Sequence, residues 1–352
     1  MRWVGAMFGA SVMLGVAMGG AAAANFADPM DTPAVPVPAP ARQPMIAVGR
    51  AGGHLVAVGV RGVVATSDAS ATKWTQASVP VESDLVAVRF INAEDGWACG
   101  HNGVILHSTD GGRSWVKQLD GDGARTAFEA YYNQKIAAGD AALSADLAEV
   151  QLNFDSGPTL PWLGVWFDDA RTGYVVGSFG DLAVTHDGGE SWHPWLEHID
   201  NPNFYDLNAI RNVGGKLYIV GEQGGVYVLD SKTRMFVARP TGYDGSLFGI
   251  TGTARAIVVF GMRGNIFRSV DEGKSWTKSS DPSSSSIMAG AVLADGRFVL
   301  VNVEGDVLVS DDAGQSFSVR ARLPGMALTD FAEMDAKHWL VTGLEGIKTI
   351  DP

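Results

Sequence analysis

The chain has 352 residues, 46% of them hydrophobic, and 39 acidic against 26 basic side chains give it a net charge of −13. This negative balance argues against general nucleic-acid binding, which needs a basic face, and against simple adsorption to anionic lipid. With one cysteine, Cys99, the chain forms no intramolecular disulfide.

Residues 1–24 have the pattern of a cleaved secretory signal. Arg2 precedes a short apolar run, and the stretch ends in small residues with alanine at positions 22 and 24. An uncleaved anchor is the alternative, although the run is short for a membrane span and rich in Gly and Ala. We therefore expect a secreted protein, located in the periplasm, with no membrane span after cleavage.

Residues 25–44 form a linker. Six prolines in this stretch favour an extended, weakly structured segment, and they are Pro29, Pro33, Pro36, Pro38, Pro40 and Pro44.

A turn motif, the Asp box, recurs along the rest of the chain. Its pattern is Ser/Thr-x-Asp-x-Gly-x-x-Trp/Phe, with four matches and two weaker copies around Asp68 and Asp230. The carboxylate can accept hydrogen bonds from turn amides, glycine takes positive φ, and the ring packs on apolar neighbours. We expect a structural role for Asp68, Asp110, Trp115, Asp187, Trp192, Asp271, Trp276, Asp312 and Phe317.

The spacing of the boxes predicts the fold. The six Asp positions follow one another after 42, 77, 43, 41 and 41 residues. Turns of the form G-x-x-G recur at the same period, and one degenerate copy brings the number of repeats to seven. A period near 40 built from strands and turns is typical of propeller blades. The sequence therefore predicts an all-β, seven-bladed propeller over residues 45–352.

The long gap of 77 residues indicates an insertion at residues 119–160, between blades two and three. Its apolar residues change to helical spacing, which predicts one helix over 124–138 and a second that Asp140 caps. Two hypotheses stay open here. The insertion either packs on the propeller without a further role or forms a cap that binds a partner.

The last blade stops before its own fourth strand. Asp351 lies where the next Asp box would begin, so no sequence follows for an outer strand. An unpaired outer edge is a liability. We therefore predict that the linker, within residues 32–43, supplies this strand and closes the ring.

These features resemble a known family. The Asp boxes, the G-x-x-G turns, the phrase WACG at residues 97–100 and the helical insertion are similar to the photosystem II assembly and stability factor family. The resemblance covers residue 45 to the end, and it is stronger to secreted bacterial relatives labelled bacterial-neuraminidase-repeat proteins. The photosynthetic members are lumenal assembly chaperones that bind a reaction-centre subunit. The resemblance implies a protein partner in a membrane or envelope complex, such as an exporter of the resistance-nodulation-division type. It also implies a lumenal location if the source is photosynthetic.

We expect the binding site on the face that carries the G-x-x-G turns, which the insertion should overhang. The alternative is that these are ordinary solvated turns. The candidate partner-binding residues are Arg61, His101, Phe179, Glu222, Met262, Arg263 and Leu344 in the turns, and Phe128, Tyr131 and Tyr132 in the insertion.

The sequence predicts no catalytic residues, no cofactor and no metal site. A sialidase needs three arginines around a carboxylate, and the repeats are too short and regular for the usual active-site loops. The predicted function is a non-catalytic, monomeric protein-binding propeller that acts as an assembly or accessory factor. The alternative is a glycan-binding or sialidase-like glycoside hydrolase propeller.

Overall fold

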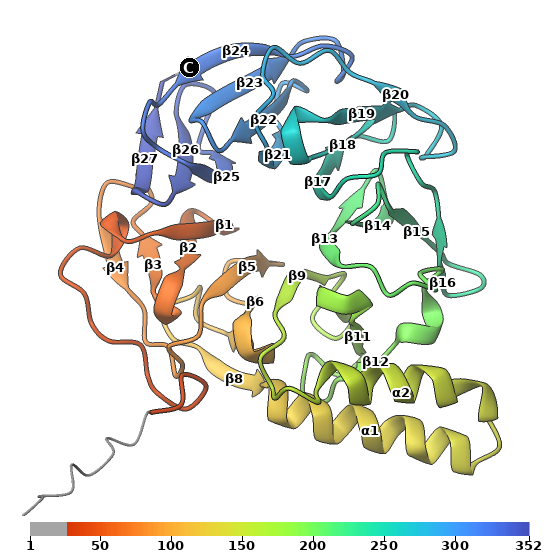
Figure 1. Cartoon of the computed structure of the whole chain (residues 1–352). Coiled ribbons are helices and arrows are strands. Elements are labelled where there is room, and N and C mark those ends of the chain that lie inside the picture. The colour runs from red at the N-terminus through yellow and green to blue at the C-terminus, as the bar shows by residue number, and fades with distance from the viewer. Residues whose placement is uncertain (1–26, 352) are drawn as a thin grey trace, which may run out of the picture.

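The computed structural model describes residues 27–351, so the predicted signal lies outside the described residues. Seven antiparallel sheets stand around a central axis like the blades of a propeller (Figure 1). The predicted seven-bladed fold is therefore confirmed. Among the described helices, none has the length and apolar character that a membrane crossing needs.

Each of blades one to four has four strands in sequence order. Blade one contains β1 (Met45–Ala51), β2 (His54–Gly59), β3 (Val64–Ser67) and β4 (Trp74–Gln76), and blade two contains β5 (Leu85–Phe90), β6 (Gly96–Gly100), β7 (Ile105–Ser108) and β8 (Val116–Leu119). Blade three contains β9 (Trp162–Phe167), β10 (Gly173–Gly177), β11 (Leu182–Thr185) and β12 (His193–Pro194), and blade four contains β13 (Leu207–Val213), β14 (Lys216–Gly221), β15 (Val226–Asp230) and β16 (Met235–Ala238).

Blades five and six repeat this pattern, and blade seven has three strands. They contain β17 (Leu247–Gly252), β18 (Ile257–Gly261), β19 (Ile266–Ser269) and β20 (Thr277–Lys278), then β21 (Ile287–Val292), β22 (Phe298–Asn302), β23 (Asp306–Ser310) and β24 (Ser318–Arg322), and finally β25 (Leu328–Glu333), β26 (Trp339–Gly343) and β27 (Gly346–Ile350).

The second strand of each blade lies in the core between neighbouring blades. In β6, β10, β18, β22 and β26 every residue is buried. A strand that is covered on both faces has an almost continuous apolar sequence instead of an alternating one. This is why stretches such as IVVFG recur in the chain at blade spacing.

The Asp boxes close the turns between the third and fourth strands. In blade two, Asp110 Oδ1 accepts hydrogen bonds from the backbone N–H groups of Arg113 (2.9 Å) and Ser114 (3.0 Å). The Ser114 hydroxyl donates to Asp110 Oδ2 over 2.6 Å, and Trp115 is buried against blade one. The two bonds from the serine recur at Asp187, Asp271 and Asp312. The bond from the preceding N–H recurs at Asp312, which accepts from Gln315 over 3.0 Å. These turns lie on one face of the ring, here named the Asp-box face.

The ring closes without the predicted strand. Blade seven has three strands, and the 32–43 segment contributes a short 3-10 turn, Pro40–Arg42, which lies against β27. Val37, Trp74 of β4 and Ile347 of β27 all pack against one buried cluster that includes Met45 and Val63. The prediction of a closing strand was therefore wrong, and the prolines explain why. Proline has no backbone N–H to donate to a ladder, so the segment forms no strand. It is held instead by packing and by single bonds, such as the one from the Val37 N–H to Gln76 Oε1 of β4 over 2.7 Å.

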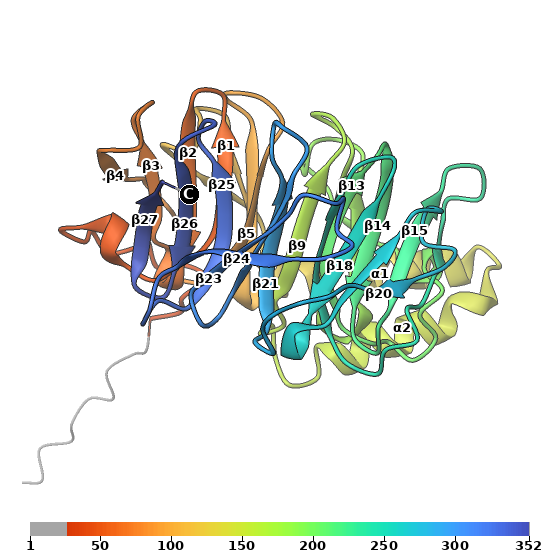
Figure 2. The same cartoon turned by 90° about the horizontal axis from the view of Figure 1, so that it is seen from above.

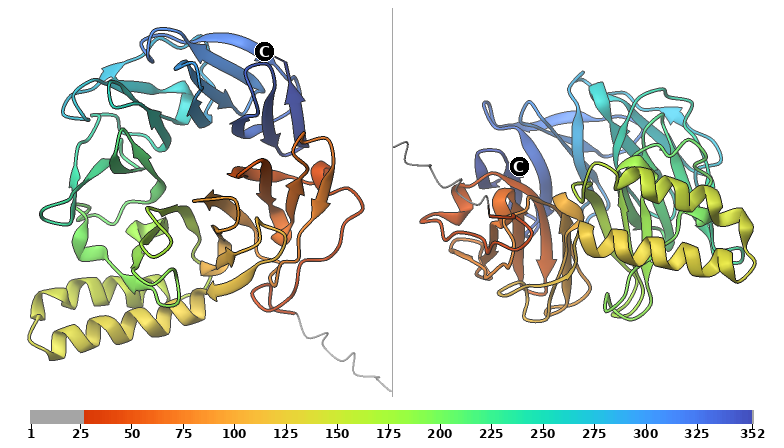
Figure 3. Two further views of the ribbon diagram at one scale, coloured as in Figure 1. Left: turned by 180° about the vertical axis from the view of Figure 1, so that it is seen from behind. Right: turned by 60° about the horizontal axis from the view of Figure 1, so that its bottom comes forward.

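The insertion forms two helices, α1 (Gly121–Ala137) and α2 (Ser144–Asn153), which lie side by side along the outer edge of the ring (Figure 3). Helix α1 begins three residues earlier than predicted, and Asp120 caps it by accepting a hydrogen bond from the Gly123 N–H. Asp140 makes no capping bond and precedes a 3-10 turn, Ala141–Leu143. Seen edge-on, the helices lie toward the face opposite the Asp boxes (Figure 2).

Candidate binding site at the mouth of the central channel

The innermost strands begin on the face that carries the G-x-x-G turns, here named the insertion face. The start of each inner strand pairs with the end of the second strand, as Met45 pairs with Gly59. Helix α1 lies beside the blade-two turn, His101–Gly103, on this same face. The two faces of the ring therefore present different turns, and the insertion belongs to the one opposite the Asp boxes.

All seven inner strands carry a β-bulge at the same place. The second residue of each strand has no partner in the ladder, so the register shifts there. A bulge bends the strand and re-aims the unpaired side chain. We name these residues the bulge ring, and they are Ile46, Val86, Leu163, Asn208, Phe248, Met288 and Thr329.

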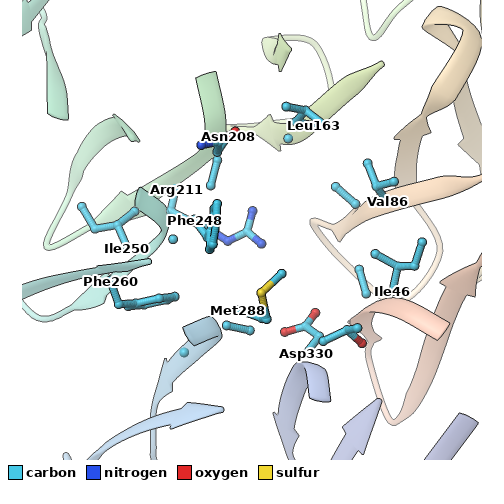
Figure 4. A pocket seen from close by; sticks show the side chains of 18 residues that line it. Ile46, Val86, Leu163, Asn208, Arg211, Phe248, Ile250, Phe260, Met288 and Asp330 are labelled. Carbon is cyan, nitrogen blue, oxygen red and sulfur yellow. The ribbon is translucent and has the colours of Figure 1, made fainter. Parts of the chain in front are cut away.

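The bulge ring lines a cavity of about 240 Å³ on the propeller axis. Figure 4 shows that its side chains come from strands all around the channel. Five of the seven are apolar, and two, Asn208 and Thr329, are polar. Two charged residues also line the cavity, Arg211 of β13 and Asp330 of β25. The arrangement offers an apolar collar with a few polar groups, which is typical of a binding pocket.

The residue after each bulge is small in six blades and acidic in the seventh. The six small residues let neighbouring inner strands approach closely. A Cβ on Gly164 would lie 3.3 Å from the Ala209 Cα of the next blade. In blade seven the residue is Asp330, whose Oδ2 accepts a hydrogen bond from the Val48 N–H of blade one over 2.8 Å. Burial raises the pKa of the Asp330 carboxyl.

The G-x-x-G turns share a strained backbone. Their third residue has positive φ in five blades, including Arg61 (φ 53°), Phe179 (φ 53°) and Arg263 (φ 56°). The left-handed conformation costs a non-glycine residue about 1 kcal/mol. The same turns are attached to the next blade, because the Arg61 N–H donates to Asp84 Oδ1 (2.7 Å) and the Phe179 N–H to Asp206 Oδ1 (2.6 Å).

None of the predicted turn residues lines the cavity. Arg61, His101, Phe179, Met262, Arg263 and Leu344 are exposed, and Glu222 is half-buried and accepts a hydrogen bond from the Asp206 N–H. They belong to turns between the second and third strands, so they lie farther from the axis than the bulge ring. Their predicted contact with a partner stays a prediction, but the mouth of the channel is formed by other residues.

Two of the three predicted insertion residues are unavailable to a partner. Phe128 and Tyr132 are buried in one apolar cluster with Trp162 of blade three. The Tyr132 hydroxyl donates to Glu197 Oε2 over 2.8 Å. Tyr131 is half-buried, and its ring lies 5.2 Å from that of His193. This corrects the expectation for Phe128 and Tyr132: the chain itself covers the apolar face of α1.

The bulge ring, Arg211 and Asp330 were missed by sequence reasoning. A signal for the bulge is present, because most inner strands begin with a large apolar residue, any residue, and then Ala or Gly, as in LVA at 85–87. It becomes visible only after all seven copies are aligned. For Asp330, which departs from its blade equivalents, and for Arg211, which among them is matched only by Arg89, no such pattern exists.

Other chemistry on the described part of the chain is limited. Residues 27–351 contain no group of three or more His, Cys, Asp or Glu side chains placed to hold a metal ion. Cys99 is fully buried in blade two, and burial raises the pKa of its thiol. The side chain is therefore a core residue rather than a reactive thiol.

Comparison with known proteins agrees with this architecture. The chain is 26% identical over 179 residues to the photosystem II assembly protein Ycf48 of Synechococcus sp. strain JA-3-3Ab. This match covers 46% of this chain, which spans about half the length of the curated relatives it matches. Two solved structures, described as YCF48 bound to D1 peptide and YCF48 from Cyanidioschyzon merolae, superpose with TM-scores of 0.62 at 16% identity. They cover 88% and 90% of this chain, and 93% and 96% of their own.

A family model covers more of the chain than these pairwise matches. The model for the photosynthesis system II assembly factor YCF48 matches residues 66–135 and 140–342, which include all or part of every blade, most of helix α1 and all of helix α2. The protein therefore belongs to the YCF48 family of seven-bladed propellers.

Proposed function

We propose that this protein is a non-catalytic, protein-binding propeller that acts as an assembly or accessory factor for a membrane complex. One observation supports this above the others. Of the eight large apolar side chains that are exposed on residues 27–351, four lie in equivalent turns of the insertion face. These four are Phe179, Met262, Val303 and Leu344. Apolar side chains that gather on one face are typical of a protein-interaction surface.

The family supports the same proposal. One YCF48 structure is described as bound to a D1 peptide, so a propeller of this family binds a polypeptide. For this chain the partner is proposed to be an envelope protein, with an exporter of the resistance-nodulation-division type as the finer proposal. The signal pattern at residues 1–24 supports a periplasmic location.

The structure also decides which experiment tests the insertion face. Deleting the insertion is unsuitable, because Phe128, Tyr132 and Val150 belong to the core shared by blades two and three. A photo-crosslinking residue at position 344 tests the surface without removing core packing. Leu344 is 54% exposed, and Val270, which is 61% exposed in an Asp box of the opposite face, serves as the matched control.

We expect position 344 to crosslink to an integral membrane protein in intact envelope, and position 270 not to do so. Phe179→Asn should weaken the crosslink, because it removes an exposed apolar side chain from this face. The turn should keep its shape, because asparagine adopts the same left-handed conformation at the equivalent residue Asn102 (φ 60°). Equal crosslinking at both positions, or none at 344, would contradict the proposal. Binding of the protein to a glycan array in the absence of a membrane partner would favour the glycan-binding alternative.

A further inference from the structure

Three side chains occupy equivalent positions on the inner strands of consecutive blades, and one of them, Arg211, lines the cavity. Arg89 of β5, Trp166 of β9 and Arg211 of β13 each follow the bulge residue of their strand by three positions. The Arg89 guanidinium lies over the Trp166 ring, with its Cζ 4.0 Å from the ring centroid. Trp166 is itself held by Asp168, whose Oδ1 accepts a hydrogen bond from the indole N–H over 2.8 Å. We name these three residues the arginine–tryptophan row.

Neither guanidinium of this row forms an ion pair within the described residues, although the charge of Asp330 acts on Arg211 across the cavity. Among residues 27–351, the ion pairs include neither Arg89 nor Arg211. The Arg89 Nε is buried with no hydrogen-bond partner, and Arg211 donates to the carbonyl of its neighbour Ile210 over 3.1 Å. Burial, together with the nearby Arg211 charge, lowers the pKa of Arg89 to about 10. Two like charges in a half-buried wall are unfavourable unless an anion lies between them.

One carboxyl group shares the cavity but does not balance these charges by contact. Asp330 Oδ2 accepts the Val48 N–H, and Asp330 Oδ1 accepts the Phe331 N–H over 2.8 Å. Both of its oxygens are therefore directed at the backbone of the seam between blades one and seven. Figure 4 shows the Arg211 guanidinium pointing into the open cavity, with Asp330 on another side of it.

We propose that the central channel binds a carboxylate, which Arg211 and Arg89 hold while its attached apolar group contacts the bulge ring. A guanidinium matches a carboxylate with two parallel hydrogen bonds, and Arg is preferred over Lys where this geometry matters. The collar of Ile46, Val86, Leu163, Phe248 and Met288 favours an apolar group on the ligand over a fully polar anion.

The carboxylate has two possible sources, a free organic acid or the C-terminus of a polypeptide. Three residues of strand separate the bulge ring from the row, which is roughly 10 Å at about 3.3 Å per residue. The last three residues of an extended polypeptide span the same distance. The site does not require the proposed partner role, and crosslinking at position 344 remains a separate test of that role.

Isothermal titration calorimetry on the mature full chain distinguishes these sources. The probes are sodium butyrate, the peptide N-acetyl-Leu-Ala-Leu with a free C-terminus, the same peptide as its amide, and inorganic phosphate. We expect the free-acid peptide to bind at least about tenfold more tightly than its amide. Tighter binding of butyrate than of the peptide would assign the site to a free acid.

Substitutions within the row test the contacts. We expect Arg211→Gln and Arg89→Gln each to weaken binding of the free-acid probe by about tenfold or more. Arg211→Lys, which keeps the charge but loses the planar fork, should weaken it less. Arg320→Gln, an exposed position on the outermost strand of blade six, is the matched control. Circular dichroism checks that each variant is folded.

Three results would overturn the proposal. They are equal affinity for the acid and amide peptides, unchanged affinity in Arg211→Gln, and tighter binding of phosphate than of any carboxylate. Absence of a saturable signal for every carboxylate probe up to about 10 mM would do so as well, because that limit excludes even weak specific binding.

Discussion

The backbone N–H of Val48 donates a 2.8 Å hydrogen bond to Oδ2 of Asp330, and this bond joins the first blade to the last. Next to it, the Thr329 hydroxyl donates to the carbonyl of Met45 over 2.7 Å. No strand is shared between the two blades. The ring is thus closed by side-chain to backbone bonds and by packing of β1 against β25.

Removing the Asp330 carboxyl should therefore weaken ring closure. Asp330→Ala leaves the N–H groups of Val48 and Phe331 without their acceptor, and we expect a loss of about 2 kcal/mol in the free energy of unfolding. Asp330→Asn keeps one acceptor oxygen and should lose less. Urea denaturation followed by tryptophan fluorescence measures both. An unchanged midpoint in Asp330→Ala would show that packing alone closes the ring.

The Asp181–Asn153 contact predicts a pH dependence. The Asn153 amide donates to Asp181 Oδ1 over 3.0 Å and links α2 to blade three. Burial raises the pKa of Asp181 to about 7 from 3.8, with a further contribution from the Glu149 and Asp206 charges. The folded state therefore binds more protons than the unfolded state between these values, so stability falls as pH rises through this window.

Asp181→Asn should flatten that dependence. The wild type is expected to lose up to about 4 kcal/mol of unfolding free energy between pH 4 and pH 7 from this group. The variant keeps the side-chain shape and carries no charge, so it should be more stable than the wild type at pH 8. Urea unfolding at pH 4.5, 6 and 7.5 measures this. A slope that survives in the variant would assign the dependence to other groups.

The Asp boxes predict the opposite behaviour in acid. Hydrogen bonds from Ser191 and Thr185 hold the pKa of Asp187 at about 2, although partial desolvation acts against them. The folded pKa is depressed, so this contribution is present above pH 3.8 and is lost as pH falls toward 2.

Asp187→Ala removes these acceptors at every pH. We expect a loss of about 1 to 2 kcal/mol at neutral pH, measured by thermal or urea unfolding. Glu190→Ala in the same turn is the matched control, because Glu190 is exposed and its side chain forms no hydrogen bond or ion pair with residues 27–351. Equal effects of the two substitutions would contradict a specific role for the box carboxylate.

The insertion should behave as part of the core. Phe128→Ala creates a cavity beside Trp162, and we expect a loss of about 3 to 4 kcal/mol in unfolding free energy. Leu152→Ala on the exposed side of α2 should change it by less than about 0.5 kcal/mol. If Phe128→Ala unfolds like the wild type, the helices form a detachable cap.

The repeats in the sequence made the fold predictable, because each Asp box and G-x-x-G turn marks one hairpin of one blade. The path of the linker, residues 25–44, could not be predicted from the missing Asp box of blade seven alone. Blade seven needed closure, but prolines such as Pro36 and Pro38 prevent strand pairing, and the hydrogen bonds of Thr329 and Asp330 provide closure instead.

Less of the candidate site than of the fold could be predicted from the sequence. Periodicity identified the apolar face of α1, including Phe128 and Tyr132, but an apolar helix face is the same in sequence whether a partner or the chain itself covers it. The bulge residues resemble any strand residue until the ladder is known. Arg89, Trp166 and Arg211 are separated in sequence by whole blades, and only the ring places them at one level.

The seam between blades one and seven differs from the other six contacts between neighbouring blades. The backbone crosses the other six joints, but at this one only hydrogen bonds and packing oppose separation. A ligand that widened the channel would load every joint, and this is the one joint at which no covalent connection adds to the non-covalent contacts. The diameter of the channel is therefore set in part by a joint that can open without stretching the backbone.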